Sequence, residues 1–395
     1  GVGVYAGVGV GLAVSVLFSN VNAMVESGAV LSAPNGTVTV SASTGSEAKD
    51  IENINDDTQS VNDKVAELIF DTDTSTIRLI SVTGGGGLVG VGVTIAVLLV
   101  FTEVNAVLAG DVAAARNVEV HAGVDFGQVI TGTLAVSGGF VGVAVSGAVT
   151  YFQATVMSAI AGTANISNVT GNIKVTTNGC TNAIAAASSI AGGAVAVNAG
   201  MALTINRTRV DTFIGQGVTI DSPGADVLVK TTYIANASAF TIGVSVGGVA
   251  VGATLAIVIN LLDAYTYIGL TPSGTPAAGS SAATAGSVKA STVNISSDVA
   301  GVTTVFGIGV SGGGVAVNGI VALGFNRAVG CAALYCANVE AGGITITAVL
   351  SGDTTVTTTS LVLGGVAVGA TVALAQIKSV NRAMLDATGS TVKAN

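Results

Sequence analysis

Four aspartates in one acidic stretch have the residue type and spacing to bind a hard cation. Residues 46–79 carry 9 of the 22 acidic residues, and "NINDDT" and "DTDT" place carboxylates close together within this stretch. Calcium prefers oxygen ligands of this kind. The stretch lacks a complete EF-hand loop and the glycine-rich calcium nonapeptide, so a solvated acidic loop is the competing interpretation. Calcium is the one cofactor that the sequence leaves open, and its candidate ligands are Asp56, Asp57, Asp71 and Asp73.

The other polar residues form no constellation suited to catalysis. An active site needs titratable groups brought together, but the single histidine, His121, lies in "VEVHA", where alternation turns its ring outward. Glycine-rich matches such as "GVGVYAGVG" carry little weight in a chain with 55 glycines. The arginines are dispersed singly: Arg116, Arg207, Arg209, Arg327 and Arg382. We therefore expect no enzyme, no catalytic residue and no cofactor-binding residue.

The three cysteines, Cys180, Cys331 and Cys336, are too few and too scattered for a disulfide framework. In an extended chain the Cα atoms of Cys331 and Cys336 would lie roughly 16 Å apart, against a ceiling of about 7 Å for a bridge. A disulfide in "CAALYC" would therefore require a turn inside that segment. We expect the cysteines to behave as small buried apolar residues.

The composition argues against a nucleic-acid partner and against a membrane-spanning helix. Charged residues are 9% of the chain, against about 25% in a typical soluble domain. A net charge of -9 with 13 basic residues leaves no patch that could neutralise phosphates, so we expect no nucleic-acid partner. The longest apolar run, residues 88–101, falls short of the roughly 20 residues of a membrane-spanning helix, so we expect no membrane span.

A repeated unit organises nearly the whole chain. Gly-Gly pairs follow one another from Gly84 at spacings of 54, 54, 55, 65 and 52 residues, and the long gap holds a Pro/Ser/Ala-rich loop at 271–287. Periods of this size are typical of repeat proteins. We expect a single array of about seven repeats, near 1–83, 84–137, 138–191, 192–246, 247–311, 312–363 and 364–395, with an acidic insertion at 46–80. The glycines expected to shape its corners are Gly138, Gly139, Gly192, Gly193, Gly247, Gly248, Gly312, Gly313, Gly364 and Gly365.

The fold class that this pattern predicts is an all-β solenoid. In "SVGGVAVGATLAIVIN" (245–260) the bulky residues occupy one parity and Ala, Gly and Thr the other, which is the period of a strand. Equivalent strands would stack in parallel, with two coils of about 27 residues per repeat favoured over one large coil. The alternative is a stack of β-hairpins folded at the Gly-Gly turns.

The two parities are predicted to face different surroundings. The bulky parity is expected to fill the solenoid interior. The small parity has two interpretations: a closely packed second layer, from this chain or another, or a weakly polar exterior. Asparagines recur at one repeat position and are expected to stack as a ladder that caps a turn. They are Asn206, Asn260 and Asn326.

The repeats resemble those of large bacterial filamentous adhesins. The segments "GGVAVGATLAIVIN", "AYTYI" and "DVLVKT" carry this resemblance to filamentous-haemagglutinin-like and leukotoxin-type surface proteins. It implies a secreted, cell-surface protein whose β-solenoid forms a rigid shaft for spacing or display. The partners so implied are further copies of the chain, through unpaired strand edges, and a host or neighbouring-cell surface.

The alternative function is that of a carbohydrate-binding or carbohydrate-cleaving β-helix. That function would require the aromatic side chains to line one groove together with acidic residues. The tyrosines concerned are Tyr151, Tyr233, Tyr265, Tyr267 and Tyr335.

Overall fold

The chain folds into strands and turns. The computed structural model describes residues 5–45, 76–270, 286–335, 337–387 and 390–394, and it has no helix within these ranges. The expected all-β class is therefore confirmed. The strands are β1 (Ala6–Val25), β2 (Val30–Gly45), β3 (Thr76–Leu108), β4 (Asp111–Ile160), β5 (Asn165–Ser167), β6 (Asn172–Gly215), β7 (Thr219–Gly269), β8 (Ser287–Tyr335), β9 (Asn338–Asp386) and β10 (Val392–Ala394).

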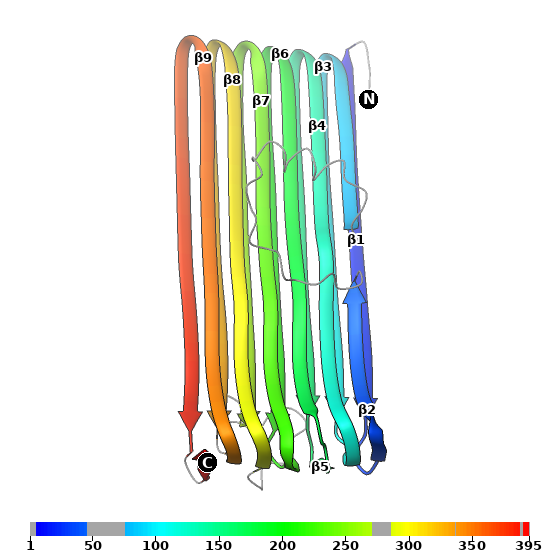
Figure 1. Cartoon of the computed structure of the whole chain (residues 1–395). Coiled ribbons are helices and arrows are strands. Elements are labelled where there is room, and N and C mark those ends of the chain that lie inside the picture. The colour runs from blue at the N-terminus through cyan, green and yellow to red at the C-terminus, as the bar shows by residue number, and fades with distance from the viewer. Residues whose placement is uncertain (1–4, 46–75, 271–285, 336, 388–389, 395) are drawn as a thin grey trace.

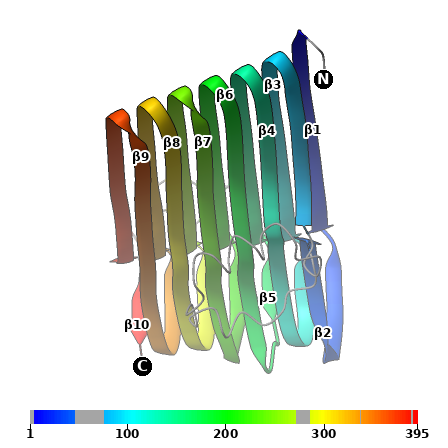
Figure 2. The same ribbon diagram turned by 90° about the horizontal axis from the view of Figure 1, so that it is seen from above.

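Successive coils stack in parallel to form a β-solenoid (Figures 1 and 2). One row of paired residues runs through β3, β4, β6, β7, β8 and β9, at Val89, Val141, Val195, Val249, Val315 and Val366. Stacked hairpins would place antiparallel strands side by side, so the hairpin alternative is wrong. Because each residue pairs with its equivalent one full repeat away, each repeat makes one large coil. The preference for two coils of about 27 residues was also wrong.

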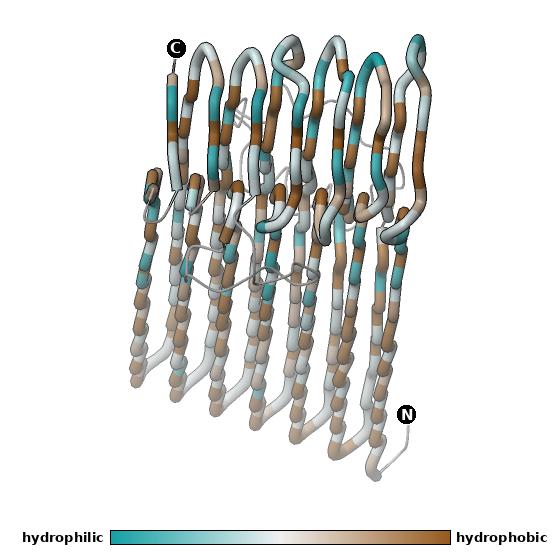
Figure 3. The backbone as a smooth tube through the Cα atoms, turned by 90° about the horizontal axis from the view of Figure 1, so that it is seen from below, coloured by the Kyte–Doolittle hydropathy of each residue, from teal (hydrophilic) through white to brown (hydrophobic). Residues whose placement is uncertain are grey.

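Each coil has two long faces and a short base. In β7, residues 227–246 run toward the Gly-Gly turn and form part of what we call the pre-turn face. Residues 249–268 run back and form part of the post-turn face. Short stretches such as β5, which pairs with Thr219–Asp221, close the base. Figure 3 shows the rounded base nearest the viewer and the turns farthest away.

The interior changes character between the base and the turns. At the base a wide core holds large side chains such as Val118, Ile173 and Ile220, together with Tyr233. Toward the turns the buried residues are mostly alanines, including Ala148, Ala202, Ala237 and Ala256. The coil is therefore thick at the base and thin near the Gly-Gly turns.

In the thin half the bulky parity faces outward, which contradicts our expectation. Ala250 and Ala256 are fully buried, whereas Val249 is 40% exposed. The reason is close approach of the two faces: a Cβ added to Gly243 would lie 2.6 Å from Thr254 Cγ2 on the opposite face. Only small residues fit there. The close second layer, one of the two interpretations of the small parity, is the other face of the same coil, and the weakly polar exterior is wrong.

The recurring asparagines lie in the interior and bind the opposite face. Asn206, Asn260 and Asn326 occupy one row, and all three are buried within continuous strands. Asn260 Nδ2 donates to the carbonyls of Ala235 and Val302, at 2.8 and 3.0 Å. The stacking is as predicted, but these bonds join the two faces. The amides therefore cross-link the coil and do not cap a turn, because the strands continue past them.

Buried hydroxyls form a second cross-link between the faces. Thr177, Thr212, Thr231 and Thr266 alternate between the two faces, and each Oγ1 bonds to the next at 2.7 or 2.8 Å. Ser158 extends the chain beyond Thr177 at 3.0 Å. A satisfied buried hydrogen bond contributes about 1 kcal/mol. This chain therefore links three successive coils through their interior.

The Gly-Gly turns stack so tightly that one glycine column admits no side chain. A Cβ at Gly193 would lie 2.2 Å from the carbonyl oxygen of Gly139, and Gly193 has a φ of 153°. Equivalent contacts of 2.4 Å or less exist at Gly139, Gly247, Gly313 and Gly364. At Gly138, Gly192 and Gly312 a Cβ would meet nothing within 4 Å. The ten corner glycines therefore differ in how strictly the fold requires them.

Candidate interaction surface

The acidic stretch enters and leaves the pre-turn face of the first coil. Gly45 pairs with Asp125, and Thr76 pairs with Gln128. The partners of Gly45 and Thr76 in the next coil are separated by only two residues. The calcium candidates Asp56, Asp57, Asp71 and Asp73 lie outside the described residues, as does most of the 271–287 loop. Among the described residues, no group of three or more His, Cys, Asp or Glu side chains could hold a metal.

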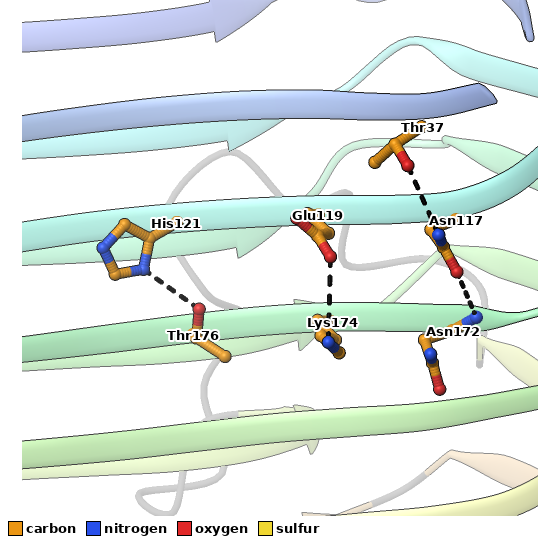
Figure 4. A network of polar contacts seen from close by, with 7 residues as sticks. All are labelled: Thr37, Asn117, Glu119, His121, Asn172, Lys174 and Thr176. Atoms are coloured by element: carbon orange, nitrogen blue, oxygen red, sulfur yellow. Dashed lines mark hydrogen bonds and ion pairs between the residues drawn. The ribbon is translucent and has the colours of Figure 1, made fainter. Parts of the chain in front are cut away.

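His121 belongs to a set of polar contacts between adjacent coils near the base of the pre-turn face (Figure 4). Its Nδ1 lies 3.0 Å from Thr176 Oγ1. Beside it Lys174 Nζ lies 3.7 Å from Glu119 Oε1. Burial lowers the pKa of His121, against the raising effects of Thr176 and Glu119. These residues join neighbouring strands, and the hydroxyl that contacts the His121 ring is that of Thr176.

A second polar cluster lies near the base of the post-turn face. Arg209 Nε donates to Asp211 Oδ2 at 2.7 Å, and the Arg209 guanidinium lies 5.8 Å from the centre of the Tyr265 ring. Burial raises the pKa of Asp211, and the bond to Arg209 opposes that shift. In the adjoining coils Arg327 Nη2 contacts Asp263 Oδ1 at 3.2 Å. Two ion pairs, Arg209–Asp211 and Arg327–Asp263, thus lie near the base of this face.

The tyrosines do not share one groove. Tyr233 is fully buried in the base core, and Tyr267 is 1% exposed and stacked on Phe213 at 5.0 Å. Tyr151 lies on the post-turn face, where its ring centre is 5.5 Å from that of Phe101. The arrangement that carbohydrate binding required of these residues is not present.

Cys180 and Cys331 carry free thiols. Cys331 is 1% exposed, as expected of a small apolar residue. Burial raises the pKa of the Cys180 thiol to about 11, so little thiolate exists at neutral pH and the group is a poor nucleophile. Cys336 lies outside the described residues.

A continuous apolar area lies on the post-turn face, and we call it the apolar face. It comprises five outward residues in each coil, for example Val249, Val251, Ala253, Leu255 and Ile257 in β7. The paired stretches in the other coils are 6–14, 89–97, 141–149, 195–203, 315–323 and 366–374. Every outward residue in these stretches is aliphatic, Met, Ala or Gly.

A shallow groove crosses the apolar face along the solenoid axis. Its floor is a row of small residues, Ala199, Ala253, Gly319 and Ala370, which pair from coil to coil. Larger side chains such as Met201 and Leu255 form the adjoining ridge. The cavity has a volume of about 460 Å³. The apolar face is therefore ridged in a regular way.

Among the described residues of the post-turn face, charge is confined to the base side. Figure 3 shows the hydrophilic residues gathered toward the base. After the turns of β3, β6, β7, β8 and β9 the first charged residues on the post-turn face are Glu103, Arg207, Asp263, Arg327 and Lys378, and the post-turn part of β4 has none. The pre-turn face is more polar at the same height, since outward residues there include Arg78, Ser188, Thr357 and Thr359. In β7 the outward pre-turn residues Phe240, Ile242, Val244 and Val246 are apolar as well, so the post-turn face differs in having no polar outward residue in these stretches.

Sequence analysis missed the apolar face because it assigned the bulky parity to the interior. One feature of the sequence bears on which parity of these strands faces the interior. Thr254 and Asn260 share the small parity, and polar side chains there can bind the facing strands. The regularly placed hydroxyl and amide side chains of that parity therefore fit a thin interior, in which they bind the opposite strands, equally as well as a solvent-exposed surface.

Comparison with protein-family models, curated proteins and solved structures finds no match to this chain. Among the described residues, no helix has the length and apolar character to cross a membrane.

Proposed function

We propose that the chain is a shaft segment of an extracellular bacterial adhesin or filament. In this proposal it spaces or displays other parts of a cell-surface assembly, and copies of it associate with one another. The observation that carries the proposal is the parallel register, which runs through seven coils from β1 to β9. Each coil adds about 4.8 Å along the axis, so such an array lengthens as a rod.

Stiffness supports the mechanical role. The pairing between β8 and β9 is continuous across nearly the whole coil, from Ser287 with Asn338 to Tyr335 with Asp386. The interior adds cross-links between the two faces through the threonine chain and Asn260. Bending the rod would strain many of these bonds together. The polar contacts described above join neighbouring strands, as expected of a structural surface.

Display at the cell surface can be tested by immunogold electron microscopy of cells that produce the protein. An antibody against the chain is expected to label intact cells, because a shaft outside the cell is accessible without permeabilisation. An antibody against a cytosolic protein serves as the matched control and should label only permeabilised cells. Labelling by the first antibody only after permeabilisation would contradict an extracellular role.

A further inference from the structure

We propose that the apolar face is covered by the apolar face of a second copy of this chain. This inference deepens the self-association contained in the proposed function and rests on it. It names the surface involved and pairs the rods side by side through their post-turn faces. The first argument is the regularity of the face: each of seven coils presents five outward residues without a single polar side chain.

The area is sufficient for a stable pair. Five outward residues span nine positions, or roughly 30 Å at about 3.3 Å per residue, and seven strands at about 4.8 Å span roughly 34 Å. The apolar face therefore covers about 1,000 Å². A typical stable protein interface buries about 800 Å² on each partner, and apolar patches larger than a few hundred Å² mark interaction sites.

The apolar face has a trough and a ridge that can pack against another β-sheet. The row of Ala199, Ala253 and Gly319 is a trough beside a ridge that contains Met201 and Leu255. Two sheets pack face to face about 10 Å apart with interdigitated side chains. Because both copies have the same coil spacing, a ridge of one copy can lie along the trough of the other over several coils.

Electrostatics permits this contact. The charged residues begin on the base side of the apolar face, and Arg209–Asp211 and Arg327–Asp263 are already paired there. Covering the apolar face therefore buries no unpaired charge, which would otherwise cost several kcal/mol. The interface would have an apolar centre and a charged rim along one side, the usual anatomy of a protein contact.

A lipid occupant fits less well. The net charge of -9 opposes binding to an anionic bilayer. Insertion of the thin, turn-proximal edge would also carry Arg78, Ser188 and Thr357 of the pre-turn face into hydrocarbon at the same height, where polar groups are costly. We therefore assign the apolar face to a second copy, and vesicle binding becomes an outcome of the test.

The test compares two substitutions in one coil. Val251 and Val244 are both half-buried outward valines in β7, each three residues from the Gly-Gly pair, but on opposite faces. Sedimentation velocity across a concentration series is expected to show reversible pairing of the wild-type chain. Val251→Lys should raise the dissociation constant by at least about 100-fold, because like charges or buried lysines in an interface cost several kcal/mol. Val244→Lys should change it less than about threefold.

Circular dichroism must show that each variant keeps its strands, and Val197→Lys in β6 is a second variant of the same face if Val251→Lys unfolds. Equal weakening by Val251→Lys and Val244→Lys would overturn the assignment of the face. So would a wild-type chain that stays monomeric and co-sediments with phosphatidylcholine vesicles. A chain that associates only end to end, as rods in electron micrographs, would refute the lateral pairing alone and leave the shaft proposal standing.

Discussion

Replacement of Gly193 by alanine is expected to lower the free energy of unfolding by about 2–4 kcal/mol. The added Cβ would lie 2.2 Å from the carbonyl oxygen of Gly139 and 3.0 Å from that of Phe140, and the φ of 153° disfavours any side chain. Backbone atoms in a stacked column cannot move aside as the end of a flexible side chain can. The measurement is urea denaturation monitored by circular dichroism.

The adjacent glycine provides the matched control. A Cβ at Gly192 meets nothing within 4 Å, and the residue paired with it in the next coil is Val246. The fold thus already accepts a side chain at this position. Gly192→Ala is expected to change the free energy of unfolding by less than about 0.5 kcal/mol. If Gly192→Ala lowered the free energy of unfolding as much as Gly193→Ala, the glycine column would not be the part of the turn that requires glycine.

These two glycines show what the sequence could and could not predict at the corners. The recurring pairs marked the turns, because one glycine of each pair stands in the column that admits no side chain. A pair in the sequence does not show which member faces the neighbouring coil. That distinction depends on the direction in which each Cα–H bond points in the stacked turn, and no local pattern encodes it.

A larger side chain in the thin interior should lower the free energy of unfolding about as much as a side chain in the glycine column. Ala256→Leu is expected to lower the free energy of unfolding by about 3 kcal/mol, because overpacking a close-packed core forces strain. Ala256 is fully buried, and its paired neighbours in the adjacent coils are Ala202 and Ala322. Thermal and urea denaturation of the purified variant measure the loss.

Ala253 offers the same substitution on the opposite parity. It is an exposed residue of the same strand, and its side chain lies in the groove of the apolar face. Ala253→Leu is expected to stay within about 0.5 kcal/mol of the wild type. If Ala253→Leu were the damaging change and Ala256→Leu the tolerated one, the bulky parity would be inside and the orientation described here would be reversed.

The sequence showed the alternation of bulky and small residues along each strand. It did not show which of the two parities faces the interior. Val249, Val251 and Leu255 stand on one parity whichever way the strand faces. Burial of apolar area favours large residues inside, and this argument holds at the base, where Ile173 and Val229 are buried. Near the turns it fails, because the two-residue corner holds the faces too close together for any large side chain.

The candidate site was also predictable only in part. The sequence correctly placed His121 on an outward position, and it indicated the coil-to-coil stacking of Asn206, Asn260 and Asn326. The apolar face arises only when seven outward strips lie side by side, so it depends on the coil number and on the facing of each strand. Both are properties of the assembled solenoid and not of any single repeat.

The measurement that tests this account most directly is electron cryomicroscopy of the isolated chain. We expect strands stacked about 4.8 Å apart along the solenoid axis and running perpendicular to that axis. In cross-section the two faces should lie well under the usual 10 Å apart near the turns and separate toward the base. Strands that run along the solenoid axis, or two faces equally far apart from base to turn, would contradict the thin-edged solenoid on which the shaft and its apolar face depend.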